Sequence, residues 1–201
     1  MAITSAIITR FELQVDDSSE LSSTESLALA QEIYDDICND RPWEWLKATA
    51  TGTTSTVVSY IALPADFREL SLNKDNKSVI FVGSDYQEYK VVPFSSRRDY
   101  RDQDGICYID IPNSRLYFTK QPTAAEAIEY DYIKNPADLT GATSPIFPAK
   151  YHNVVAYGMA GKFNNIEQTE KDGSYQNENQ TEYYKLLSDM RMEDSNIKLT
   201  M

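Results

Sequence analysis

The sequence predicts an α+β protein in which N- and C-terminal helices form a small helical bundle that carries a large antiparallel β insertion. Apolar residues recur at helical steps near both ends of the chain, whereas the middle alternates short β-prone runs with turn formers. The terminal helices cannot bury their apolar stripes alone, so they should pack together with the sheet projecting from them. The predicted divisions are residues 1–48, 49–135 and 136–201, and the last of these ends in an extended tail.

Residues 4–15 fit two patterns. Ile7, Phe11 and Val15 recur at helical steps. Leu13 alternates with Phe11 and Val15, as it would in a strand. A short helix is the favoured interpretation.

The principal helix is predicted at residues 24–38, after a loop of acidic and hydroxyl residues at 16–23. Pro42 ends this helix, because its ring excludes helical geometry for the preceding residue and removes an amide donor. Trp43 and Trp45 follow at once. Each ring can bury roughly 150–250 Å², so the two side chains are expected to anchor the helix in the core.

Six short runs between residues 69 and 133 predict strands, because they are bounded by turn formers. These runs are Glu69–Asn73, Ser78–Val82, Glu88–Pro93, Ile106–Ile111, Arg115–Thr119 and Glu126–Ile133. Residues 49–59 also predict strand and turn, and residues 95–102 predict one or two helical turns. Two of the strand pairs have the short loops of hairpins, so the region is expected to be antiparallel.

Helix signals return after a linker at residues 137–148. Pro148 suits the first turn of the next helix. Gly158 and Gly161 each cost roughly 1 kcal/mol relative to alanine inside that helix, which predicts close approach of another helix. A last helix follows, and residues 193–201 are expected to be frayed or available to a partner.

Composition limits the classes of function. The chain has 201 residues and a formal net charge of −12, without the basic stripe that binds nucleic-acid phosphates. An acidic surface either keeps a protein soluble and monomeric until it meets a partner, or lines a passage that DNA crosses without sticking. The 14 tyrosines favour interfaces that are first wet and later buried.

The location of the protein is predicted from its cysteines and its apolar runs. Cys38 and Cys107 lack the spacing of a disulfide frame or a zinc site and are expected to be buried thiols in a reducing compartment. No signal peptide and no membrane span are visible. Synthesis in a cytoplasm is therefore expected.

The sequence shows no catalytic or cofactor motif. His152 is the only histidine and lacks the partners of a metal site or a general base, so a structural role is expected. Acidic pairs such as Asp102 and Asp104 are available for hydrolysis, although solvated surface explains them. The basic cluster at residues 97–101 is either a solvated turn or a salt-bridging contact to an acidic neighbouring subunit. No catalytic residue, cofactor or metal is expected.

Five segments in a fixed order resemble the head-to-tail connector proteins of tailed bacteriophages, also called adaptor or head-completion proteins. They are FELQVDDSSELS, NDRPWEWLK, YIALPADFREL, YDYIKNPADL and PIFPAKYHNVVAYGMAGKF. The resemblance covers about Phe11 to Met190 and depends on packing and turn patterns. It implies that five residues are scaffold packing positions: Trp43, Trp45, Pro64, Phe67 and Tyr151.

The resemblance implies a structural protein of the phage neck, made in the host cytoplasm. Family members form a ring, commonly of twelve copies, between the portal protein and tail or neck proteins, and double-stranded DNA passes through the lumen. The helices build the ring, and the β insertion, which is long for the family, reaches toward the tail. Leu187–Met201 is then the candidate portal-contacting segment, with the contact residues Leu187, Met190, Met192, Ile197 and Leu199.

Two other functions stay open. One is a soluble β-rich binding module of a tail component, which recognises a carbohydrate or a receptor through exposed aromatic residues. The other is a carboxylate-based hydrolase. A connector should form rings alone or with its portal protein, whereas a binding module should stay small and bind a ligand.

Overall fold

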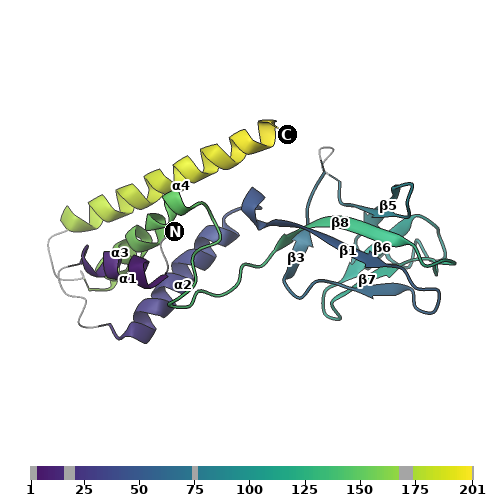
Figure 1. Ribbon diagram of the computed structural model, residues 1–201, viewed down its shortest axis with the longest axis horizontal. Helices are drawn as coiled ribbons and strands as arrows, with labels where there is room; N and C mark the ends of the chain where they lie inside the picture. Colours follow the sequence, from purple (N-terminus) through teal and green to yellow (C-terminus); the bar gives the residue numbers. More distant parts are fainter. Residues whose placement is uncertain (1–3, 16–20, 74–76, 168–173, 201) are drawn as a thin grey trace. The chain divides into compact units, whose positions relative to one another are not determined.

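The computed structural model describes residues 4–15, 21–73, 77–167 and 174–200 of the chain. By its internal contacts the chain divides into two compact units (Figure 1). The helical unit consists of Met1–Trp45 and Pro136–Met201, and the β unit consists of Leu46–Asn135. The mixed α+β class that the sequence predicts is confirmed, with helices in one unit and an antiparallel-rich sheet in the other.

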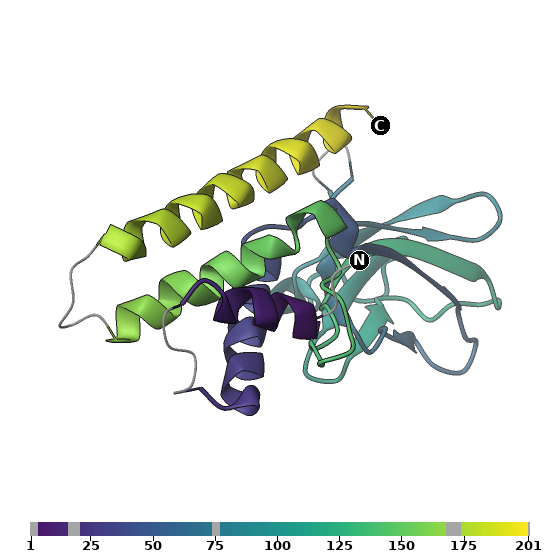
Figure 2. The same cartoon turned by 60° about the vertical axis from the view of Figure 1, so that its left-hand side comes forward.

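Four α-helices are found in the described part of the helical unit. They are α1 (Thr4–Glu12), α2 (Ser23–Asn39), α3 (Asn153–Glu167) and α4 (Ser174–Thr200). The segment at the start of the chain, which fits both a helix and a strand by its sequence, is thus a helix, as expected. α3 contacts each of the other three helices, and Figure 2 shows it running beside α4. Phe11 of α1 meets Phe163 of α3 edge to face, with ring centroids 5.7 Å apart.

The limits of α2 follow from its sequence. The Ser22 hydroxyl accepts a hydrogen bond from the Glu25 backbone N–H, and the Glu25 carboxylate accepts one from the Ser22 N–H. Hydrogen bonds from Ser22 lower the pKa of Glu25. The helix ends before Pro42, where the Trp43 indole N–H donates to the Ile37 carbonyl at 2.6 Å.

Two glycines let α3 approach its neighbours closely, as the sequence predicts. A Cβ atom added at Gly158 would lie 2.6 Å from Ile33 Cγ2 of α2 and 3.0 Å from Tyr183 Cε2 of α4. One added at Gly161 would lie 3.1 Å from Gln180 Cγ of α4. Distances this short leave little room for a side chain, so glycine is favoured at both positions.

The end of α4 differs from the expectation of a frayed or extended tail. α4 continues as a helix to Thr200. The physical reason lies in two acidic residues that the sequence pattern leaves out of the apolar stripe. Glu193 and Asp194 both bind groups outside α4, and these contacts hold the helix in place beyond its last buried apolar residue.

Eight strands form one sheet in the described part of the β unit. They are β1 (Lys47–Thr53), β2 (Tyr60–Ala62), β3 (Phe67–Leu70), β4 (Val79–Val82), β5 (Gln87–Val92), β6 (Ile106–Asp110), β7 (Arg115–Phe118) and β8 (Ala127–Lys134). Their order is β1-β8-β4-β5-β6-β7-β2, and β3 pairs with β8. The six predicted strands are confirmed within a few residues of their expected limits.

One pair departs from the expected antiparallel arrangement. β5 and β6 run parallel, with Val91 opposite Cys107. Residues 93–105 cause this, because they return the chain to the end of the sheet where β5 begins. They start with the 3₁₀ turn η2 (Phe94–Ser96), which lies in the region of predicted helical turns. The antiparallel hairpins are β4–β5 and β6–β7.

The sheet encloses a single apolar core. All eight strands contribute to one cluster, whose fully buried members include Ile80, Cys107 and Leu116. Because each strand turns one face toward this cluster, the sheet is curled. Its two end strands, β1 and β2, therefore border the same cavity.

Candidate partner-binding surfaces

The last turns of α4 are bound to the end of α2. Asp194 is fully buried, accepts a hydrogen bond from the Glu44 backbone N–H at 2.7 Å and pairs with Arg41 at 3.6 Å. Arg191 donates to Asp40 through Nε at 2.9 Å and through a second guanidinium nitrogen. A buried carboxylate needs such partners, so this cluster fixes the position of α4 within the helical unit.

A second carboxylate of α4 binds two residues that lie just before α3. The Tyr151 hydroxyl donates to Glu193 Oε2 at 2.7 Å, and Lys150 Nζ binds the same oxygen. The hydrogen bonds from Lys150 and then Tyr151 lower the pKa of Glu193. The carboxylate is therefore held in its charged form to lower pH than a free glutamate.

The structure separates the five residues that the resemblance implicates in portal contact. Leu187 and Met190 are 5% and 0% exposed, so they pack inside the helical unit. Met192 is 57% exposed. The side chains of Ile197 and Leu199 lie outside the described residues, although their backbone belongs to α4. Of the five, Met192 is the side chain that the structure places at the surface.

The five expected scaffold positions lie in both units. In the helical unit Trp43 is fully buried and stacks on Trp45, with ring centroids 4.3 Å apart, and Tyr151 is buried as well. In the β unit Phe67 stacks on a tyrosine of β8 with centroids 5.7 Å apart, and Pro64 lines a cavity. Three of the five positions thus belong to the helical unit and two to the β unit.

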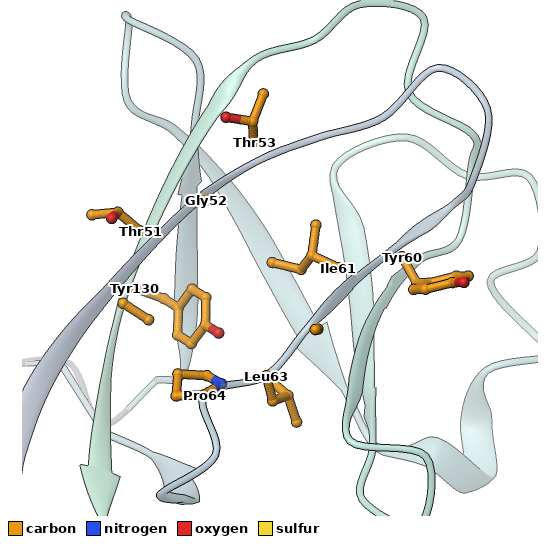
Figure 3. Close-up of a pocket in the computed structure, with 10 residues that line it drawn as sticks. Thr51, Gly52, Thr53, Tyr60, Ile61, Leu63, Pro64 and Tyr130 are labelled. Carbon is orange, nitrogen blue, oxygen red and sulfur yellow. The ribbon is translucent and has the colours of Figure 1, made fainter.

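The cavity lies between β1 and β2 and has a volume of ≈ 480 Å³ (Figure 3). Its lining contains no charged side chain and consists of Ala50, Thr51, Gly52, Thr53, Tyr60, Ile61, Ala62, Leu63, Pro64 and Tyr130. Figure 3 shows Ile61 pointing into the space between the two strands, whereas Tyr60 points away from it.

The backbone at this cavity offers free pairing groups. Within the described residues β1 pairs with β8 alone and β2 pairs with β7 alone. The Thr54 N–H donates to the Glu126 carbonyl at 2.9 Å. Because the backbone groups of successive residues in an antiparallel strand point to opposite sides, the even-numbered residues of β1 pair with β8. The backbone groups of Thr49, Thr51 and Thr53 are consequently turned toward the cavity. Such an edge can pair with an extended segment of another protein.

A continuous series of aromatic rings lies on the outer face of β6, β7 and β2. Tyr108 stacks on Tyr117 with centroids 5.2 Å apart and planes inclined by 8°. Tyr117 meets Tyr60 with centroids 5.3 Å apart. Arg115 covers the Tyr60 ring, its guanidinium carbon 4.0 Å from the centroid. These contacts hold all four side chains in one row.

The row continues beyond β6. Phe94 of η2 meets Tyr108 with centroids 5.9 Å apart, and Arg97 lies over the Phe94 ring at 3.8 Å. We call the whole set the aromatic–arginine stripe: Arg115, Tyr60, Tyr117, Tyr108, Phe94 and Arg97. Of the predicted basic cluster, Arg97 belongs to the stripe, whereas Arg101 pairs with Asp102 at 3.6 Å.

Sequence reasoning missed both the cavity edge and the stripe. The stripe leaves a weak signal, because Arg115 and Tyr117 alternate with the buried Leu116 and Phe118 along β7. The pairing of β2 with β7 places Tyr60 opposite Tyr117. That pairing joins segments 57 residues apart and is not visible in the sequence.

The groups considered for catalysis are not brought together. His152 is buried, with Nε2 3.0 Å from the Phe147 carbonyl oxygen. Asp104 is exposed and binds Lys120 at 2.9 Å, and this hydrogen bond lowers the pKa of Asp104. Burial raises the pKa of the Cys107 thiol to about 12, so the thiol stays protonated and unreactive.

The described ranges of the chain show neither a metal-binding cluster nor a membrane-spanning helix. Among those residues, no three His, Cys, Asp or Glu side chains are grouped so that they could hold a metal ion. In the same ranges, no helix is both long and apolar enough to cross a membrane. The predicted buried state of both cysteines is confirmed, and each is a free thiol.

Comparison with known proteins identifies a family whose model matches this chain. A family model described as SU10 adaptor protein matches residues 4–198, which is nearly the whole chain. A search of the curated proteins found no match. The matched range includes residues of the helical unit and the complete β unit.

Proposed function

This chain belongs to the SU10 adaptor protein family, and we propose from that premise that it forms an oligomeric ring in a phage neck. It is a phage structural adaptor protein of the virion. In the proposed ring, which contains about twelve copies on the family pattern, it joins the portal to the tail and continues the DNA channel. The observation that carries the proposal is a family match that spans both structural units.

The two units have different roles in this proposal. The four helices pack as the bundle that builds the ring. The β unit faces the tail or neck proteins that complete the particle. Its cavity edge supports this role, because unpaired strand edges and an uncharged lining accept an extended protein segment without burying a charge.

The portal-facing surface is proposed to lie on the outer side of α4. Leu187 and Met190 are buried and hold the helix in the unit, whereas Met192 is exposed. The last turns of α4, which include Ile197 and Leu199, extend this surface toward its end. Arg191, Glu193 and Asp194 keep that part of the helix in place, so the portal would meet a preformed helix.

The acidic composition supports a role beside DNA. A net charge of −12 gives a channel wall that repels phosphate, so the genome passes during ejection without sticking. A ring whose lumen was lined by arginine and lysine, with the carboxylates on its outer rim, would contradict this part of the proposal.

The alternative of a carbohydrate-binding module would use exposed aromatic faces on the sheet. The stripe is the aromatic surface that such a module would need. One face of each ring is covered, because Tyr108 and Tyr117 stack on each other and Arg115 covers Tyr60. A sugar needs a free ring face to stack on, so the geometry favours the adaptor function.

The test is to mix the purified chain with the portal protein of the same phage and image the product. A ring of this chain docked on the portal, also visible in a reconstruction of the virion neck, is the expected result. Solution mass alone is a poor measure, because a connector can stay monomeric until the portal nucleates the ring. A virion neck that lacks this polypeptide would overturn the proposal.

A further inference from the structure

We propose that neighbouring copies in the ring, which is built by their helices, also contact each other through their β units, with the aromatic–arginine stripe of one copy packed on a row of carboxylates of the next. This inference depends on the proposed ring function and adds a defined interface to it. The occupant of the stripe is a second copy of this chain. The argument uses the composition of each face, their positions in the sheet and their opposite charge.

The stripe has the composition of a strong protein–protein contact. Tyrosine and arginine are enriched among residues that dominate binding energies. Here the stacking of Tyr108, Tyr117 and Tyr60 holds the rings in fixed orientations before any partner arrives. Little side-chain freedom is left to lose on association, which favours binding.

The partner face lies on β5, β4 and β8. Phe81 of β4 is opposite both Glu88 of β5 and Glu129 of β8, so these side chains share the outer face of the sheet. Asp131 lies two residues beyond Glu129 on the same face and accepts a hydrogen bond from the Thr49 hydroxyl at 2.6 Å. We call Glu88, Glu129 and Asp131 the carboxylate row, and all three are exposed.

Charges of the other sign on each face have local partners. Asp110 lies opposite Arg115, but it is 8% exposed and accepts hydrogen bonds from the Asn113 backbone N–H and side-chain amide. On the carboxylate face, Lys90 of β5 lies over the Tyr100 ring at 5.7 Å. The guanidinium groups of the stripe and the three carboxylates are thus the charges available to a partner.

The two faces point in different directions. In the strand order, β7 at the centre of the stripe is separated from β8 by β6, β5 and β4 on one side, and by β2, the cavity and β1 on the other. Because the sheet curls around one core, Arg115 and Tyr117 on β7 face a different direction from Glu129 and Asp131 on β8, although the stripe and the row meet at the paired strands β5 and β6. A contact between unlike faces of identical copies is heterologous, and its repetition closes a ring when the rotation allows.

The charge of the two faces indicates that the partner of the stripe is a second copy of this chain. Each copy carries a net charge of −12, so most surfaces of two copies repel each other. The stripe carries two guanidinium groups at the ends of an aromatic row, and the carboxylate row is their complement on the same molecule. Pairing these faces removes the repulsion at the place where two acidic copies must touch.

The experiment is a charge exchange across the proposed contact. Arg115→Glu and Glu129→Arg are made singly and together, and the yield of complete rings on the portal is measured by electron microscopy. Each single variant places like charges together, and the yield should fall by roughly tenfold or more. The double variant restores an opposite pair and should recover most of the yield. Asp138→Arg, an exposed change in the helical unit, is the matched control and should form rings normally.

The outcomes separate this contact from the ring function. Normal rings from both single variants, or no recovery in the double variant, would overturn the contact and leave the adaptor function intact. A wild-type chain that forms no ring on the portal would overturn both. Thermal melting of each variant shows whether it folds.

A covalent probe keeps the test decisive if a charge variant is unstable. The double variant Arg115→Cys with Glu129→Cys should give a ladder of disulfide-linked copies when assembled rings are oxidised. The native Cys38 and Cys107 are buried and should not contribute. Assembled rings that give no ladder would overturn the contact.

Discussion

The helical unit and the β unit differ in the backbone groups that they offer to a partner. In the helical unit even the buried Asp194 has its hydrogen bond and its ion pair, and two glycines let the helices pack closely. Among its described residues, the β unit has two end strands, β1 and β2, that each pair on one side and border an uncharged cavity. Exposed apolar side chains occur in both units, for example Val57 (85%) in the β unit and Leu13 (83%) in the helical unit. The comparison indicates that the β unit offers strand edges for pairing with a partner, whereas the backbone of the helices is used within each helix.

The largest expected effect tests whether the helical unit depends on its buried carboxylate. Asp194→Ala removes the acceptor of the Glu44 amide and the carboxylate that pairs with Arg41. The free energy of unfolding should fall by about 3 kcal/mol, as is usual when one member of a buried pair is lost. Urea unfolding followed by circular dichroism measures it. The exposed Asp138→Ala is the control, and a loss below about 1 kcal/mol for Asp194→Ala would show that α4 is held by other contacts.

A smaller loss of stability should follow from adding a side chain where α3 lies closest to its neighbours, at Gly158. Gly158→Ala places a methyl group 2.6 Å from Ile33 Cγ2, so α2 or α4 must shift. We expect destabilisation by about 2 kcal/mol, in the range of overpacked cores. Gly141→Ala is the matched control, because an added Cβ there has no described atom within 4 Å. Equal unfolding midpoints for the two variants would contradict the close packing of α3.

The β unit should respond in the opposite direction to a glycine at its hairpin turn. Ser114 has a φ of 50° in the β6–β7 turn, a conformation that costs an L-residue roughly 1 kcal/mol. Ser114→Gly should therefore raise stability by about 0.5 kcal/mol, while Ser114→Ala should bring no gain. The measurement is the thermal unfolding midpoint of each variant. A higher midpoint for Ser114→Ala as well would contradict backbone strain at Ser114 as the cause.

The smallest effect concerns acid. The pKa of Glu193 is lowered from its ordinary value of 4.5, first by Lys150 and then by Tyr151. A lowered pKa in the folded state stabilises above the unfolded value, and this contribution is lost as the pH falls through the folded value. Glu193→Gln should thus lose less stability than the wild type between pH 5 and pH 3, measured as the change in unfolding midpoint. Parallel curves for the two proteins would show that the ion pair contributes nothing.

Much of the fold could be predicted because its signals are local. Pro42 and the Ser22–Glu25 capping box lie at the ends of α2, and turn formers bound the strands within a few residues. Gly158 and Gly161 predicted close helix contacts, because glycine inside a helix needs such a reason. These features depend on neighbours within a few positions in the chain.

The remaining features depend on contacts between distant segments. The parallel pairing of β5 and β6 is set by the path of residues 93–105, and the continued α4 helix depends on Asp194 reaching Glu44 across 150 positions. The aromatic–arginine stripe forms only when β2 pairs with β7. Periodicity carries no information on such pairings, so the candidate surfaces of the β unit could not be located from the sequence.

The discontinuity of the helical unit has a consequence for biosynthesis. Its two parts, Met1–Trp45 and Pro136–Met201, are separated by the whole β unit, so α1 and α2 leave the ribosome long before α3 and α4 exist. The β unit is one uninterrupted stretch and can fold once β8 has emerged. Closing its sheet also brings Lys47 and Ile133 together through the β1–β8 pairing, which places the two chain segments that lead into the helical unit side by side.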